Sequence, residues 1–200
     1  MKRLLYGVPL FLFVGCTVSP VADEKPTEKP STEQSTGVES TAKTVLIGAQ
    51  APAFRIKDSN GKDIELAKLT DEGPVLVRLT CGCAGCDKEL AYFQELHTVF
   101  KDKGLTSLAV FREPDTKVEA YVKTKKLNML YAVDTKGESW NVFQTKTMPA
   151  NFLIEKGGRI SAVAEGCDPS GLVANTLSEK VAGLLDTEAV DVRERVGSQK

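Results

Sequence analysis

Three cysteines lie within six residues, in the segment 81–86, which reads Cys-Gly-Cys-Ala-Gly-Cys. A compact apolar run over 75–79, typical of a buried strand, precedes this segment, and apolar residues at helical spacing follow it. The unpaired N–H groups and positive dipole end of a helix N-terminus stabilise a thiolate, which is the nucleophilic form of cysteine. The pattern therefore predicts Cys83 as the attacking thiol and Cys86, one helical turn later, as the thiol that resolves a mixed disulfide.

Cys81 and Cys167 are additional candidate redox thiols. Cys81 could form the bridge with either Cys83 or Cys86, and a bridge across one intervening residue would be strained and more easily reduced. Cys167 follows the last predicted strand, where it could be a second resolving thiol, a metal ligand or a small buried apolar residue. Asp87 comes directly after the cluster, and its negative charge would oppose thiolate formation.

The N-terminus has the features of an export signal. Lys2 and Arg3 precede an apolar run over 4–14, which is shorter than the about 20 residues that span a bilayer. The run ends in Leu-Phe-Val-Gly-Cys, which resembles the bacterial lipobox and implies a signal peptide over 1–15 with Cys16 acylated as the new N-terminus. Residues 16–44 would then form a lipidated, flexible linker, because a segment rich in Pro, Thr, Ser, Glu and Lys buries too little apolar surface to fold. We expect an exported lipoprotein that faces the periplasm or the cell exterior.

The folded domain is predicted over 45–186. Its strands alternate with helices at first and end in a hairpin and a closing helix, which indicates an α/β fold with a central mixed sheet flanked by helices. The expected strands are 54–56, 64–66, 75–79, 105–111, 129–133, 151–155 and 159–164, and the expected helices run from the cysteines to Gly104, over 116–126 and over 169–185. The charged tail, 187–200, is expected to be disordered. A net charge of −1, with no basic excess, argues against a surface that binds nucleic-acid phosphates.

Four motifs in this order resemble the thioredoxin-like redoxin family, namely the TlpA-like thiol–disulfide oxidoreductases, which are related to the AhpC/TSA peroxiredoxins. The motifs are Gly-Ala-Gln-Ala-Pro-Ala-Phe at 48–54, the turn and hairpin at 58–69, the strand and Cys-x-x-Cys at 75–86, and Thr-Met-Pro at 147–149 before a strand. The resemblance covers about residues 47–166. It implies a thioredoxin-like fold with an N-terminal β-hairpin extension. Gly82 is a departure, because the family usually has tryptophan before the first cysteine.

The resemblance also implies how the site works. A cis peptide before Pro149 would place the Met148 backbone beside Cys83, where the two residues shape a substrate groove. No dissociable cofactor and no metal are needed, because the redox-active disulfide carries the electrons. The partners would be protein thiols and disulfides together with an unidentified membrane or periplasmic electron donor.

Three alternatives remain open. A peroxiredoxin-like peroxidase would use the Thr-x-x-Cys formed by Thr80 and Cys83, although Leu76 stands where that family has proline and 148–151 contains no arginine. A metal protein would bind Cu(I) through the three clustered cysteines, or Zn(II) with Cys167 added. His97 is the only histidine and would lie about 16 Å along the helix, too far to share that metal or activate a thiol. The third alternative is a redox-inactive binding domain with a closed structural disulfide.

Overall fold

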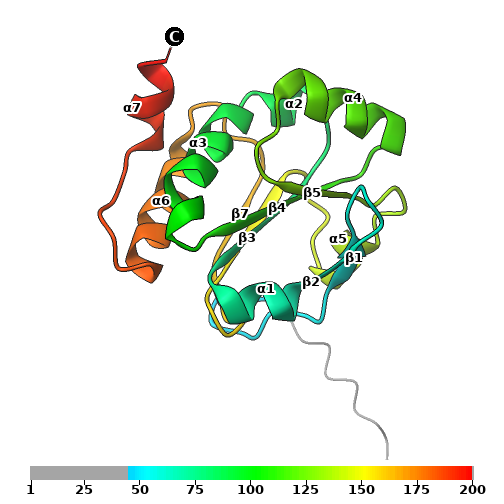
Figure 1. The fold of residues 1–200 in the computed structure, drawn as a ribbon, viewed down its shortest axis with the longest axis horizontal. Helices are drawn as coiled ribbons and strands as arrows, with labels where there is room; N and C mark the ends of the chain where they lie inside the picture. Colours follow the sequence, from blue (N-terminus) through cyan, green and yellow to red (C-terminus); the bar gives the residue numbers. More distant parts are fainter. Residues whose placement is uncertain (1–44, 200) are drawn as a thin grey trace, which may run out of the picture. The chain divides into compact units, whose positions relative to one another are not determined.

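A five-stranded sheet carries the cysteine segment at the end of its central strand (Figure 1). The computed structural model describes residues 45–199, so the predicted signal peptide, Cys16 and the linker lie outside the described residues. The strand order is β5-β4-β3-β6-β7, in which β3, β4 and β5 are parallel and β6 and β7 are antiparallel to their neighbours. The bounds are β3 Val75–Thr80, β4 Thr106–Phe111, β5 Leu130–Val133, β6 Ala150–Ile154 and β7 Ile160–Glu165. The predicted mixed sheet is confirmed.

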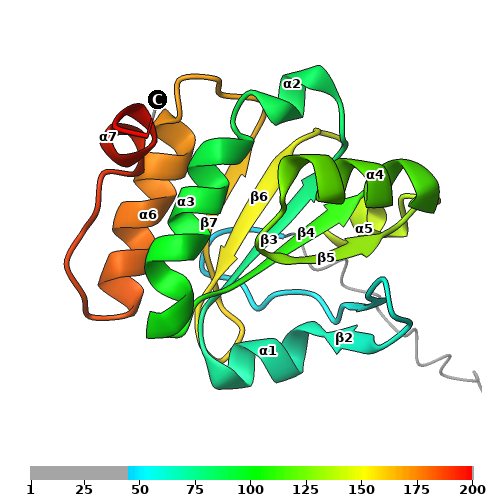
Figure 2. The ribbon, with the colours of Figure 1, turned by 45° about the horizontal axis from the view of Figure 1, so that its top comes forward.

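Helices cover both faces of this sheet. On one face lie α3 (Leu90–Phe100), α4 (Asp115–Lys125) and α6 (Leu172–Leu184), with their apolar residues in one core cluster (Figure 2). The other face packs against α5 (Glu138–Val142) and residues 45–66, through a second cluster that includes Phe54, Trp140 and Phe143. None of the helices within residues 45–199 is long and apolar enough to cross a membrane.

The N-terminal hairpin forms as expected but ends earlier. Strands β1 (Arg55–Lys57) and β2 (Asp63–Glu65) pair in antiparallel register. The prediction that Leu66 belongs to the second strand is wrong, because Leu66 is the first residue of α1 (Leu66–Glu72). Leu66 and Thr70, one helical turn apart, are the buried residues of α1. The short amphipathic pattern here has helical rather than strand periodicity.

The helix expected between the cysteines and Gly104 is divided. A short helix, α2 (Ala84–Asp87), follows Cys83, and α3 begins only at Leu90 after a break at Lys88 and Glu89. A 3-10 turn over Lys101–Lys103 then leads to Gly104, whose φ of 113° ends the segment in a left-handed conformation. The break allows the Glu89 side chain to turn inward, where it is 1% exposed.

The prediction of a disordered tail over 187–200 is wrong for its helical part. Helix α7 (Val192–Gly197) begins at Asp191, whose carboxylate accepts hydrogen bonds from the backbone N–H groups of Arg193 and Glu194. Val192 and Val196, one turn apart, are both buried, and Val192 belongs to the core cluster that contains α3 and α6. Arg195 and Glu95 of α3 form an ion pair. The two buried valines and the Arg195–Glu95 ion pair together hold this otherwise charged segment on the domain.

Candidate active site

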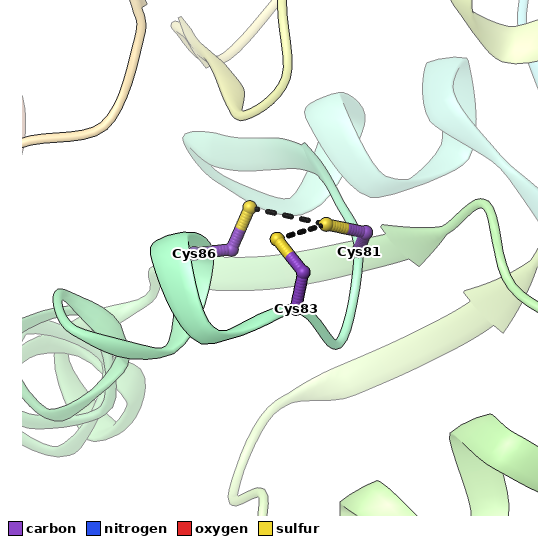
Figure 3. A group of neighbouring side chains, drawn as sticks. All are labelled: Cys81, Cys83 and Cys86. Carbon is purple, nitrogen blue, oxygen red and sulfur yellow. Dashed lines mark hydrogen bonds between the residues drawn. The ribbon is translucent and has the colours of Figure 1, made fainter.

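The three clustered cysteines bring their sulfur atoms together at the junction of β3 and α2 (Figure 3). Cys83 is the N-cap residue of α2 and is exposed, whereas Cys86 is 3% exposed inside that helix. Cys81, which is 8% exposed, has its Sγ 2.6 Å from the Sγ of Cys83 and 3.4 Å from the Sγ of Cys86. The three Sγ atoms lie within 4.8 Å of one another, and all three residues are free thiols. The Cys81 sulfur is therefore in contact with both members of the predicted redox pair.

The pKa values of two of these thiols are shifted in opposite directions. The pKa of Cys83 is lowered, chiefly because the Cys81 thiol donates a hydrogen bond to it and also because backbone N–H groups of Cys86 and Gly85 face it. The pKa of Cys81 is raised to about 12, chiefly by burial and further by its hydrogen bond to Cys83. The arrangement favours a thiolate on the exposed Cys83 that is stabilised by a neutral thiol on Cys81.

We expect iodoacetamide to modify Cys83 at lower pH than it modifies an ordinary thiol, because a lowered pKa keeps the thiolate present as the pH falls. Cys81→Ala removes the donor and should move the midpoint of the rate–pH profile upward, whereas Cys81→Ser keeps a donor and should move it less. Mass spectrometry of the Cys83 peptide across the pH range measures these midpoints. An unchanged midpoint in Cys81→Ala would show that the Cys81 thiol does not stabilise the thiolate.

The negative charge of Asp87, expected to oppose the thiolate, is compensated by α4. The Nζ of Lys125 lies 2.7 Å from one carboxylate oxygen of Asp87, and the Tyr121 hydroxyl donates to the other at 3.0 Å. Burial and the adjacent carboxylate raise the pKa of Tyr121, so this phenol remains a hydrogen-bond donor. A Cβ on Gly82, the position that is tryptophan in the family pattern, would lie 3.2 Å from the Tyr121 ring, so a side chain here would require that ring to shift.

A buried ion pair lies beneath the cysteines. The Nη2 of Arg78, in β3, lies 2.6 Å from Oε1 of Glu89, and the two side chains are 3% and 1% exposed. The same guanidinium donates to Oδ1 of Asn151 at 2.9 Å and to the Cys86 carbonyl at 3.4 Å, and it stacks on the Phe93 ring at 4.1 Å. The pair therefore connects the central strand, β6 and the α2–α3 junction.

Sequence reasoning missed this ion pair. Alternation along β3 directs Leu76 toward the core cluster of α3 and α6, and Arg78, two residues later, reaches the same side. A charged residue inside the apolar run 75–79 was the available signal, because a cation at a buried strand position requires a partner.

Cys167 lies near α2 but outside the three-sulfur cluster. It is exposed, and its Sγ donates to the carbonyl of Gly85 at 2.8 Å. The neighbouring Asp168 N–H donates to Oε2 of Glu89 at 2.9 Å, which ties the loop after β7 to the buried ion pair. The exposure of Cys167 argues against a buried apolar role. His97, on α3, does not belong to the sulfur cluster.

The peptide bond between Met148 and Pro149 is cis, as the motif resemblance implied. Pro149 is buried and Met148 is half-buried against the core cluster that contains Phe143 and Phe152. The carbonyl of Thr147 accepts a hydrogen bond from Nε1 of Trp140 at 3.2 Å, which anchors the segment. The role of Met148 and Pro149 as a substrate groove stays a prediction.

The sequence is similar to those of known thiol-dependent redox proteins. Residues 47–163 match the model of the AhpC/TSA family. A thiol-disulfide oxidoreductase ResA from Bacillus thuringiensis subsp. konkukian is 34% identical over 121 residues, which are 60% of this chain and 70% of that protein.

Two solved structures with a similar fold are less similar in sequence. The thioredoxin domain of a thiol-disulfide oxidoreductase from Bacteroides vulgatus has a TM-score of 0.59 at 23% identity, covering 68% of this chain and 98% of that one. A peroxidoxin BcpB from Mycobacterium tuberculosis has a TM-score of 0.56 at 19% identity, covering 70% and 96%. These likenesses show the fold alone, because it is shared by an oxidoreductase and a peroxidoxin. With a thioredoxin-like fold and a family match over more than half of its length, the chain belongs to the AhpC/TSA family of redoxins.

Proposed function

We propose that this protein is a thiol–disulfide oxidoreductase that exchanges disulfides with protein partners through Cys83 and Cys86. The observation that carries the proposal is the asymmetry of the pair. Cys83 is exposed at the start of α2 with a lowered pKa, whereas Cys86 is buried one turn behind it. An exposed thiolate is available to a partner, and a shielded second thiol reacts only after the first bond has formed.

In the reducing direction, the Cys83 thiolate attacks one sulfur of a partner disulfide. The partner S–S bond breaks, a Cys83–partner mixed disulfide forms, and the released partner thiolate takes up a proton. Cys86 then loses its proton and attacks the Sγ of Cys83, which releases the second partner thiol and leaves a Cys83–Cys86 disulfide. Two electrons pass from the domain to the partner, and the reverse sequence oxidises a partner dithiol.

The proposal includes the location of the protein. Export and anchoring through an acylated Cys16 would place the domain outside the cytoplasmic thiol pool, where a disulfide persists. A membrane or periplasmic thiol donor would then reduce the Cys83–Cys86 disulfide between turnovers. The support for this part is the signal-like segment over 1–15 and the lipobox resemblance that ends at Cys16.

A peroxidase is less well supported. The groups that lower the pKa of Cys83 are a thiol and backbone N–H groups, and no arginine of the described residues is among them. The buried guanidinium of Arg78 is directed instead to Glu89, Asn151 and the Cys86 carbonyl. A peroxidatic thiol would need a cation or strong donors beside the leaving oxygen.

The test is to trap the mixed disulfide. Cys86→Ser removes the resolving thiol, so a partner or a model disulfide peptide should stay attached to Cys83 and appear as a reductant-sensitive band on non-reducing electrophoresis. Mass spectrometry then identifies the linked cysteine. All variants also carry Cys16→Ser and Cys167→Ser, because Cys167 is an exposed free thiol. In this background the matched control is Cys83→Ser/Cys86→Ser, which keeps Cys81 alone and should trap nothing. Because the Sγ of Cys81 also lies 2.6 Å from that of Cys83 and could resolve the bond, the trap is repeated in Cys81→Ser/Cys86→Ser. Absence of any adduct in both variants, or an adduct on Cys81 in Cys86→Ser, would overturn the assignment of Cys83.

A further inference from the structure

Disulfide exchange uses two sulfur atoms, and this site has three. The Sγ of Cys81 is buried and lies 2.6 Å from one member of the pair and 3.4 Å from the other. The exchange chemistry of Cys83 and Cys86 leaves this third sulfur without a role as a reactant. Three soft thiols directed at one point form a ligand set for a soft metal ion.

We propose that the reduced domain binds one Cu(I) ion through the Sγ atoms of Cys81, Cys83 and Cys86. Three thiolates at about 2.3 Å from one ion stand about 4 Å from one another. The three sulfurs already lie within 4.8 Å of each other, although the two contacts of Cys81 must widen. Cys83 is exposed at the N-cap of α2, so its side chain is free to make most of this adjustment.

The surroundings favour Cu(I) over Zn(II). Structural zinc takes four ligands, and the described part of the chain gathers only three at this place. A fourth sulfur, that of Cys167, is directed to the carbonyl of Gly85, and the nearby carboxylate of Asp87 is paired with Lys125. Cu(I) accepts two or three soft ligands and needs neither an imidazole nor an oxygen donor.

Metal binding and disulfide formation would exclude each other. Binding joins Cu(I) to the sulfurs and releases the thiol protons, with no change in oxidation state. Oxidation of Cys83 and Cys86 to a disulfide withdraws two of the three ligands and two electrons, so the ion must leave. The site would therefore hold Cu(I) only while the redox pair is reduced, and a loaded domain would not exchange disulfides.

The test uses the full-length chain with Cys16→Ser and Cys167→Ser, so that the cluster supplies all remaining thiols. The reduced protein is titrated anaerobically with Cu(I) against a chromogenic Cu(I) chelator, and X-ray absorption at the copper edge counts the bound sulfurs. We expect one Cu(I) per chain with three sulfur neighbours. Adding Cys81→Ser should weaken binding by at least about tenfold and leave two sulfur neighbours.

Two further variants keep the test decisive. Ala84→Ser adds a serine hydroxyl at the exposed position next to Cys83 without removing a sulfur, so it should leave the affinity for Cu(I) unchanged. Cys83→Ser should weaken binding even if the Cys81 variant fails to fold. The proposal would be overturned if Cys81→Ser bound Cu(I) as tightly as its parent. It would also be overturned if the parent's copper had nitrogen or oxygen neighbours, or if one equivalent of Zn(II) displaced the Cu(I). None of these measurements uses exchange activity, so failure of the proposed oxidoreductase function would be seen separately.

Discussion

Cys83→Ser is expected to lower the rate of thiol–disulfide exchange by at least about a thousandfold, because residues of one catalytic unit contribute on this scale. A serine hydroxyl at this position stays protonated near neutral pH and is a poor nucleophile toward sulfur, whereas the thiolate of Cys83 is favoured by the hydrogen bond from Cys81. Cys86 cannot replace Cys83, since it is buried behind the first turn of α2. The loss should appear in the rate constant for reduction of a peptide disulfide under excess reductant.

The matched control is Cys167→Ser, which makes the same substitution at the other exposed cysteine of the described residues. Its sulfur donates to the Gly85 carbonyl and lies outside the three-sulfur cluster, so we expect a rate close to that of the parent. Cys81→Ser should retain exchange with an altered pH dependence. If Cys83→Ser kept the parent rate while Cys81→Ser lost it, Cys81 would be the nucleophile and the proposed mechanism would be wrong.

Much of the fold was predictable because its signals are local. The apolar run of β3, the helical spacing of Leu90, Phe93 and Leu96, and the turn before Arg159 each depend on neighbouring residues alone. The cis peptide at Pro149 was different, since composition around it would have favoured an ordinary loop. There the resemblance of the whole motif order supplied the correct expectation, which the structure confirms.

Other features depend on contacts that no local pattern reports. Helix α7 is stabilised because Val192 and Val196 reach the core beside α3, about a hundred residues earlier in the chain. Cys81 was recognised as an extra thiol, yet its central place among the sulfurs follows from the path between β3 and α2. The charge of Asp87 was expected to be uncompensated, because its partner Lys125 lies 38 residues further along the chain. In each case the partner, rather than the residue, was missing from the sequence pattern.

The largest effect on stability is expected at Arg78. Arg78→Met removes one partner of an ion pair that is almost fully excluded from solvent, and leaves the buried Glu89 carboxylate with the Asp168 N–H as a donor but without its cation. Such a change typically costs about 3–5 kcal/mol in the free energy of unfolding. Urea unfolding at neutral pH measures the loss as a lower midpoint at an unchanged slope.

Lys125→Met is the matched control, because it removes a cation from the Asp87 carboxylate where the two side chains are 38% and 30% exposed. That solvent-screened pair should contribute only about 0–1 kcal/mol. Arg78→Met/Glu89→Met should recover much of the stability lost in the single variant, since no buried charge is left without a partner. If Arg78→Met cost no more than Lys125→Met, the buried pair would not be what holds β3 against the α2–α3 junction.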